Sequence, residues 1–89
     1  MIDIQPLAIL REIDRTGSLT LAADRLNLTQ SAVSHAIRRF EERHGVKLWE
    51  REGHKLRLTQ TGDYLLGLAL RVLPQLEHGA TVLEDYARG

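Results

Sequence analysis

The chain has 89 residues, of which 43% are hydrophobic and 27% are charged, as expected for one small globular domain and not for a disordered protein. It contains no cysteine, which excludes disulfides, iron–sulfur clusters and thiolate zinc sites. Twelve basic and twelve acidic residues give a net charge of zero, so any affinity for nucleic acid has to come from how the charge is distributed.

Three helices are predicted in the first half of the chain. Apolar residues at helical spacing place them over residues 4–13, 19–26 and about 29–43. Ser18 and Thr29 stand where a hydroxyl can cap the second and third helices. Two helices joined by a tight turn are typical of a helix-turn-helix.

Two strands and a long helix are predicted in the second half. Apolar and polar residues alternate over 46–51 and again over 56–58, and residues 52–55 between them read as a hairpin connection. Thr59 is placed to cap a final helix over residues 60–87. The predicted fold is therefore mainly α: a winged helix-turn-helix of three helices and a two-stranded wing, followed by a long linker helix. Its two parts are expected to span residues 1–58 and 59–89.

The last helix carries more apolar residues than one buried face requires. The stripe Leu66, Leu70 and Leu73 is expected to pack on the domain, and a second stripe with near-heptad spacing is expected to meet a partner. The second stripe consists of Leu65, Ala69, Val72, Leu76 and Leu83. We therefore expect a homodimer through this helix; the alternative is that the helix folds back and buries both stripes in its own domain. Pro74 lies inside the helix, where a bend or a break is expected.

The third helix has one apolar face, with Val33, Ile37 and Phe40, and one face of short polar and basic side chains. The polar face carries Ser31, Ser34, His35 and Arg38, with Gln30 at the exposed first turn. Such a face suits a helix that enters a DNA groove by its N-terminal end. Residues 29–57 hold seven basic and four acidic residues, a local charge of +3 between negative flanks.

Several motifs stand in an ordered pattern: Gly17-Ser18-Leu19, Thr29-Gln30-Ser31-Ala32-Val33-Ser34, Glu41, Gly45 and Leu58-Thr59-x-x-Gly62. This pattern resembles the N-terminal part of LysR-type transcriptional regulators over essentially the whole chain. Within that family, the segment that begins at Thr29 is similar to the methionine-biosynthesis regulators. Family members carry a C-terminal effector-binding domain that these residues do not encode, so the chain is expected to be the DNA-binding domain with its linker helix.

The resemblance implies that the third helix enters the major groove of double-stranded DNA and that the wing, residues 47–58, approaches the minor groove. A dimer, or a higher oligomer of the full-length protein, would read an interrupted inverted repeat. Gln30 is the first candidate for base readout, because its amide can donate to and accept from adenine. Other candidates are Thr29, Ser31, Ser34, His35 and Arg38 on the helix, and Arg51, His54 and Lys55 in the wing. For Gln30 and His35 the alternative is an exposed side chain without a DNA contact, for Thr29 it is capping alone, and for Arg51 it is an ion pair with a nearby carboxylate.

An enzyme is not expected, because the histidines lack metal-ligand spacing and no Gly-rich phosphate loop or serine elbow is present. No cofactor or metal is expected either. The alternative from another class is a winged-helix protein-interaction module that does not bind DNA, which the zero net charge favours. The N-terminus lacks a continuous apolar segment, so we expect a cytoplasmic, nucleoid-associated protein without membrane contact.

Overall fold

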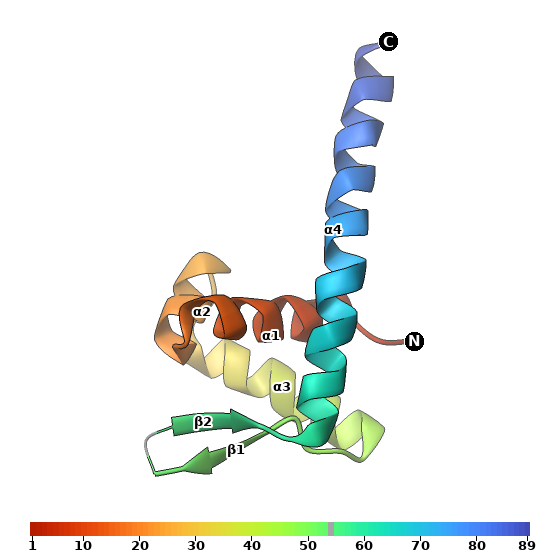
Figure 1. The fold of residues 1–89 in the computed structure, drawn as a ribbon. Helices are drawn as coiled ribbons and strands as arrows, with labels where there is room; N and C mark the ends of the chain where they lie inside the picture. Colours follow the sequence, from red (N-terminus) through yellow and green to blue (C-terminus); the bar gives the residue numbers. More distant parts are fainter. Residues whose placement is uncertain (54) are drawn as a thin grey trace.

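The computed structural model describes residues 1–53 and 55–89. Its elements are α1 (Ile4–Thr16), α2 (Leu19–Arg25), α3 (Gln30–His44), β1 (Trp49–Glu52), β2 (Lys55–Leu58) and α4 (Gln60–Arg88). The first three helices lie together, the two strands project beside α3, and α4 passes α1 and continues far beyond it (Figure 1). The long dimension of the molecule, 53 Å against 25 and 19 Å, reflects this projecting helix. The predicted fold class is confirmed.

Local sequence signals fix the ends of the helices as predicted. Ser18, Thr29 and Thr59 each accept a hydrogen bond, through the side-chain hydroxyl, from the backbone N–H three residues later, at 3.2, 3.0 and 3.0 Å. The helices α1 and α3 both end at a glycine with positive φ, Gly17 at 69° and Gly45 at 65°. These five residues set where the helices begin or end.

One hydrophobic core joins the three short helices to the long one. The largest fully buried side chains come from α1, α3 and the segment before β1: Ile9, Leu10, Val33, Ile37 and Leu48. The first half of α4 closes this core with Leu65, Ala69 and Leu73. Residues 60–73 thus pack with the helix-turn-helix. The predicted division into a DNA-binding part, residues 1–58, and a linker part, residues 59–89, stays a prediction.

The inward face of α4 differs from the one that the sequence pattern indicated. Leu65 and Ala69, expected to meet a partner, are 3% and 0% exposed within this single chain, whereas Leu70, expected to pack on the domain, is 48% exposed. The assignment of these residues was wrong because the two stripes differ by one position, about 100° of rotation, and spacing alone does not tell which one faces α1. The small side chain of Ala69 lets α1 and α4 approach closely.

The helix α4 continues through Pro74 without a break. A bend or a break was expected at Pro74, and the break does not occur. Proline has no N–H to donate, so the backbone ladder lacks one hydrogen bond at this point. One residue further on, the Gln75 side-chain amide donates to the Arg71 carbonyl at 3.2 Å. Pro74 therefore marks a weaker point in a continuous helix.

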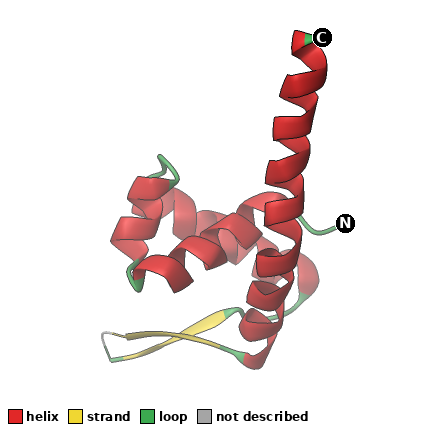
Figure 2. Cartoon of the chain, turned by 45° about the horizontal axis from the view of Figure 1, so that its top comes forward, coloured by secondary structure: helices red, strands yellow, loops and turns green. Residues whose placement is uncertain are grey.

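The first strand of the wing begins at Trp49, two residues after the predicted start of the wing at residue 47. Its strands pair antiparallel, with Trp49 opposite Leu58 and Arg51 opposite Leu56. Figure 2 shows them as a twisted ribbon that projects from the base of α4. Leu48 is fully buried in the core and does not belong to the strand.

Candidate nucleic-acid interface

Glu41 joins the end of α3 to the wing. Its buried carboxylate accepts a hydrogen bond from the Leu48 N–H at 2.8 Å, and the Lys47 ammonium lies 3.9 Å from its other oxygen. Thr59 completes the joint: its N–H donates to the Leu48 carbonyl at 3.0 Å and its hydroxyl donates to the Lys47 carbonyl. A buried carboxylate is tolerated when such donors surround it. The joint fixes where β1 and α4 start relative to α3.

Glu41 belongs to the sequence motif given above, but the motif alone did not predict that its carboxylate connects α3 to the wing. The available signal was its position four residues after Ile37, on the apolar side of α3. A carboxylate on an apolar helix face indicates a buried hydrogen-bond acceptor.

The N-terminal half of α3 is open on the side away from the core. Gln30, Ser31, His35 and Arg38 are exposed, and Ser34 is half-buried. The structure therefore brings these predicted contact residues together on one accessible surface. The Thr29 hydroxyl accepts the capping hydrogen bond from the Ala32 N–H at 3.0 Å, so capping already accounts for this residue.

The wing contributes two more of the predicted residues. Arg51 and Lys55 line a groove that the wing forms with the start of α2, together with Gly17, Ser18, Leu19 and Leu56. Arg51 stands opposite Leu56 in the strand register, and paired residues point to the same face of a sheet. Its side chain is thereby directed to the face that borders α2. The predicted role of His54 lies outside the described residues.

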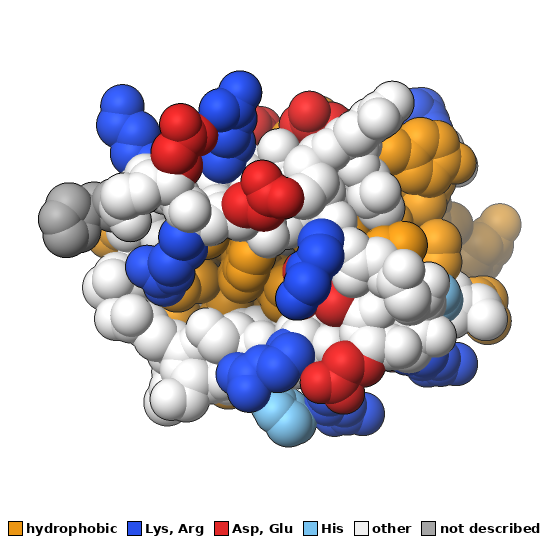
Figure 3. Space-filling view, turned by 90° about the horizontal axis from the view of Figure 1, so that it is seen from below, with side chains coloured by type: hydrophobic (Ala, Val, Ile, Leu, Met, Phe, Trp, Pro, Cys, Tyr) orange, Lys and Arg blue, Asp and Glu red, His pale blue; other side chains and the backbone are white. Residues whose placement is uncertain are grey.

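Ion pairs divide the basic residues of this region into two groups. Three are paired: Arg43 with Asp3 at 3.5 Å, Lys47 with Glu41 at 3.9 Å and Arg57 with Glu52 at 2.8 Å. Within residues 1–53 and 55–89, the other four form no ion pair: Arg38, Arg39, Arg51 and Lys55. The alternative partner for Arg51, a nearby carboxylate, is thus not found in the described chain. On the face seen from below, blue side chains of Lys and Arg alternate with red carboxylates (Figure 3).

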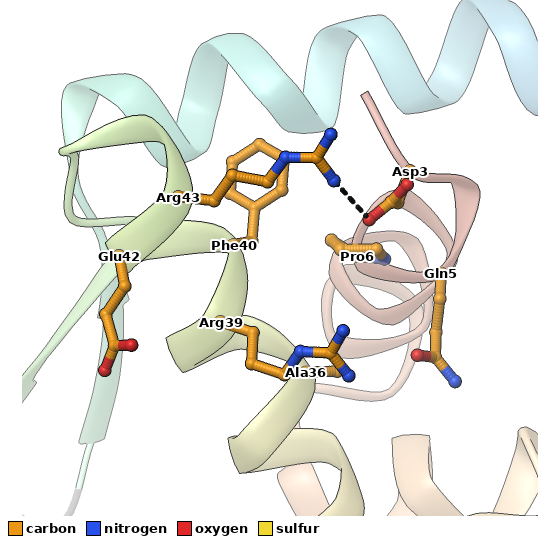
Figure 4. A pocket seen from close by; sticks show the side chains of 8 residues that line it. All are labelled: Asp3, Gln5, Pro6, Ala36, Arg39, Phe40, Glu42 and Arg43. Atoms are coloured by element: carbon orange, nitrogen blue, oxygen red, sulfur yellow. Dashed lines mark hydrogen bonds and ion pairs between the residues drawn. The ribbon is translucent and has the colours of Figure 1, made fainter. Parts of the chain in front are cut away.

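A separate pocket of about 510 Å³ lies between the start of α1 and the C-terminal half of α3. Figure 4 shows its lining, in which Arg43 points toward Asp3 and Glu42 points away from Arg39 and Arg43. The two positive and two negative groups balance, so the pocket has no excess charge for an ionic ligand. Among the described residues, none of the predicted DNA contacts lines it.

Comparison with known proteins gives a consistent result. Residues 4–63 match the model of a family described as bacterial regulatory helix-turn-helix protein, lysR family. The HTH-type transcriptional regulator MetR of Haemophilus influenzae is 43% identical over 75 residues, which cover 84% of this chain and 24% of that protein. MetR of Escherichia coli K12 is 43% identical over 76 residues, 85% of this chain and 24% of that protein.

The solved structures that are similar include DNA complexes. A crystal structure of the BenM DNA-binding domain with catB site 1 DNA has a TM-score of 0.85 and 25% identity, and the match covers 99% of both chains. The chain spans about a quarter of the length of the curated relatives that it matches.

Proposed function

Because this chain belongs to the LysR family of bacterial regulatory helix-turn-helix proteins, we propose that it binds specific double-stranded DNA and regulates transcription. One observation carries this proposal. The accessible surface of α3 presents short polar side chains, and Arg38 on this helix, like Arg51 and Lys55 in the wing, has no carboxylate partner in the described chain. Unpaired cations are available to phosphates. A protein-interaction module would not need them, so that alternative is not favoured.

We assign the contacts by geometry and chemistry. Gln30, in the first turn of α3, reads a base in the major groove, because a helix that enters by its N-terminal end brings this turn deepest. Ser31, Ser34 and His35 contact base edges or phosphates nearby. Arg38, two turns along, holds a phosphate and positions the helix. Arg51, His54 and Lys55 contact the backbone at the minor groove, and Thr29 supports the helix start.

We propose that two copies pair through α4. Leu76 and Leu83 are 46% and 69% exposed on the part of the helix that leaves the domain, and Tyr86 is exposed beside them. Together with Val72 they form an apolar stripe with near-heptad spacing. Exposed apolar stripes of this kind mark interaction surfaces. A two-fold dimer would present two α3 helices to an interrupted inverted repeat.

Further parts of the proposal concern the protein as a whole. The similar curated proteins are named transcriptional regulators, which supports a chain without catalytic activity, and the MetR similarity supports the methionine-biosynthesis branch. Within the described residues, no helix is long and apolar enough to cross a membrane, and no cluster of His, Asp and Glu could hold a metal ion. We propose a bacterial cytoplasmic regulator whose effector site lies outside these residues.

Fluorescence anisotropy tests the DNA proposal, with the DNA upstream of the gene compared with a scrambled duplex at several salt concentrations. Gln30→Ala is expected to cost roughly 1–3 kcal/mol on the upstream DNA and little on the scrambled duplex. Gln5→Ala, another exposed glutamine outside the proposed surface, is the matched control and is expected to change neither. Lys55→Ala is expected to weaken binding to both and to lower the salt slope by about one. Absence of salt-dependent binding to either duplex would contradict the proposal.

Sedimentation equilibrium tests the dimer. Leu83→Glu places a charge in the proposed contact and is expected to give a monomer with unchanged helix content. Thr81→Glu adds the same charge at an exposed position two residues away, on the other side of the helix, and is expected to remain dimeric. A parent chain that is monomeric at high concentration would refute this part.

A further inference from the structure

An arginine of α1 reaches across to α4. Arg11 donates to both carboxylate oxygens of Glu77, from its two terminal nitrogens, at 2.9 and 2.7 Å. The two residues are 66 positions apart in the sequence, so this contact joins distant parts of the chain. A two-pronged pairing of guanidinium and carboxylate fixes orientation as well as distance.

The Arg11 guanidinium relies on Glu77 for its side-chain hydrogen bonds, and the Glu12 carboxylate adds a second attractive charge nearby. The Arg11 side chain is 9% exposed and that of Glu77 is 60% exposed. The Nε atom of Arg11 is buried without a hydrogen-bond partner among the described atoms. Glu77 therefore accepts both of the hydrogen bonds that the Arg11 guanidinium donates. Glu12 and Arg15 form a second pair next to it at 3.0 Å. A buried charge that loses its partner is strongly unfavourable.

The pair stands at a particular place along α4. The last buried residue of the helix is Leu73, which is followed at once by Pro74, where the backbone ladder lacks a hydrogen bond. Glu77 lies beyond this weaker point. In the described chain, its contact with Arg11 is the only side-chain hydrogen bond or ion pair that ties residues 74–88 to another element.

We propose that the Arg11–Glu77 pair is a latch that fixes the direction of residues 74–88 and thereby the distance between the two α3 helices of the dimer. Its consequence for DNA rests on the proposed function. From Leu73 to Arg88 the helix extends about 22 Å, at 1.5 Å per residue. A change of direction of about 10° at Pro74 would displace its end by about 4 Å, comparable to one base-pair step of 3.4 Å. Glu77 is thus a positioning residue for half-site spacing, although it is far from the DNA-reading surface.

The latch is tested without DNA by pulsed electron paramagnetic resonance, which measures the distance between two spin labels. The chain has no cysteine, so Asp24→Cys on α2 and Ala87→Cys near the end of α4 give two unique labelling sites at exposed positions. A large excess of unlabelled chain ensures that only distances within one chain are measured. The parent is expected to give one narrow distance distribution. Glu77→Gln, which removes the charge and keeps the size, is expected to broaden it by several ångströms.

Glu84→Gln is the matched control, because it removes an exposed carboxylate from the same part of α4 and is expected to leave the distribution unchanged. Arg11→Met, which keeps the apolar stem, is expected to act like Glu77→Gln. Circular dichroism checks that all variants keep their helix content. A distribution for Glu77→Gln that equals that of the parent would overturn the latch, whatever the protein binds.

DNA then tests the consequence. On a footprinted upstream site, the parent is expected to lose affinity when one base pair is added to or removed from the centre. Glu77→Gln is expected to lose less on these altered sites and to bind a single half-site like the parent. Failure of the parent to bind any DNA would refute the proposed function and leave the distance result standing. An unchanged spacing preference beside a broadened distance would refute the link to DNA spacing.

Discussion

Both halves of α4 carry leucines at helical spacing, but the surroundings of these leucines are opposite. The proximal half, residues 60–73, buries Leu65, Ala69 and Leu73 against the helix-turn-helix. The distal half, residues 74–88, leaves Leu76 and Leu83 in solvent and projects alone beyond α1 (Figure 1). An apolar stripe therefore serves the fold in one half and remains available to a second copy in the other.

This difference shows that one helix can carry two separate energetic tasks. Substitutions in the proximal half should act on the free energy of unfolding, because they remove contacts within the chain. Substitutions in the distal half should act on association, because the contacts they remove are with another chain. Mutations at equivalent positions of the two halves can separate these effects.

The largest expected effect comes from truncating the same residue type in each half. Leu65→Ala opens a cavity in the core and is expected to lower the free energy of unfolding by about 2–5 kcal/mol. Leu83→Ala removes an exposed side chain and is expected to change it by less than about 0.5 kcal/mol. Urea unfolding at a concentration where the chain is monomeric measures both. Equal losses would show that the distal half packs within its own chain and would contradict the comparison.

A smaller effect is expected at two glycines. A Cβ at Gly62 would overlap the Leu48 carbonyl oxygen at the joint between wing and helix, whereas no atom of the described residues lies within 4 Å of a Cβ at Gly79. Gly62→Ala is expected to destabilise the fold by about 1–3 kcal/mol through overpacking. Gly79→Ala is expected to stabilise it by about 0.5–1 kcal/mol, because alanine favours the helix. The melting temperature should fall for Gly62→Ala and rise for Gly79→Ala. A lower melting temperature for both variants would refute the assignment of open space around Gly79.

The sequence predicted best what depends on neighbours in the chain. The caps at Ser18, Thr29 and Thr59 need only a hydroxyl three residues before a free N–H, and all three form. The polar surface of α3 was equally predictable, because helical spacing separates it from Val33 and Ile37. The exposure of this surface therefore agrees with the prediction, while its contacts with DNA stay a prediction.

What depends on distant residues could not be predicted in the same way. Two stripes one position apart on α4 satisfy the same spacing, so only packing against α1 decides that Ala69 turns inward. The bond between Arg11 and Glu77 spans 66 positions and leaves no periodic signal. Whether a basic residue of α3 or the wing is paired, like Arg57, or has no ion pair within the described residues, like Arg38, likewise depends on which carboxylate the fold brings near.

The smallest expected effect concerns pH at the boundary between the two halves. Hydrogen bonds from Arg11 hold the pKa of Glu77 below its ordinary value of 4.5, with partial desolvation opposing them and the charges of Arg11 and Arg15 adding to them. Glu12 of α1 is the remaining charged group of this cluster. A carboxyl group whose pKa is lower in the folded state stabilises that state above its unfolded pKa and loses this effect as the pH falls through its folded pKa.

The free energy of unfolding of the parent should therefore exceed that of Glu77→Gln by a constant amount between about pH 6 and pH 8, where the carboxyl group is ionised in both states. The excess should shrink only below about pH 4.5, because protonation then removes the charge that Arg11 binds. Urea unfolding of both proteins at matched salt measures this difference, and Glu84→Gln against the parent provides the control. An excess that decreases already between pH 8 and pH 6 would mean that a group other than Glu77 governs the contact between the two halves.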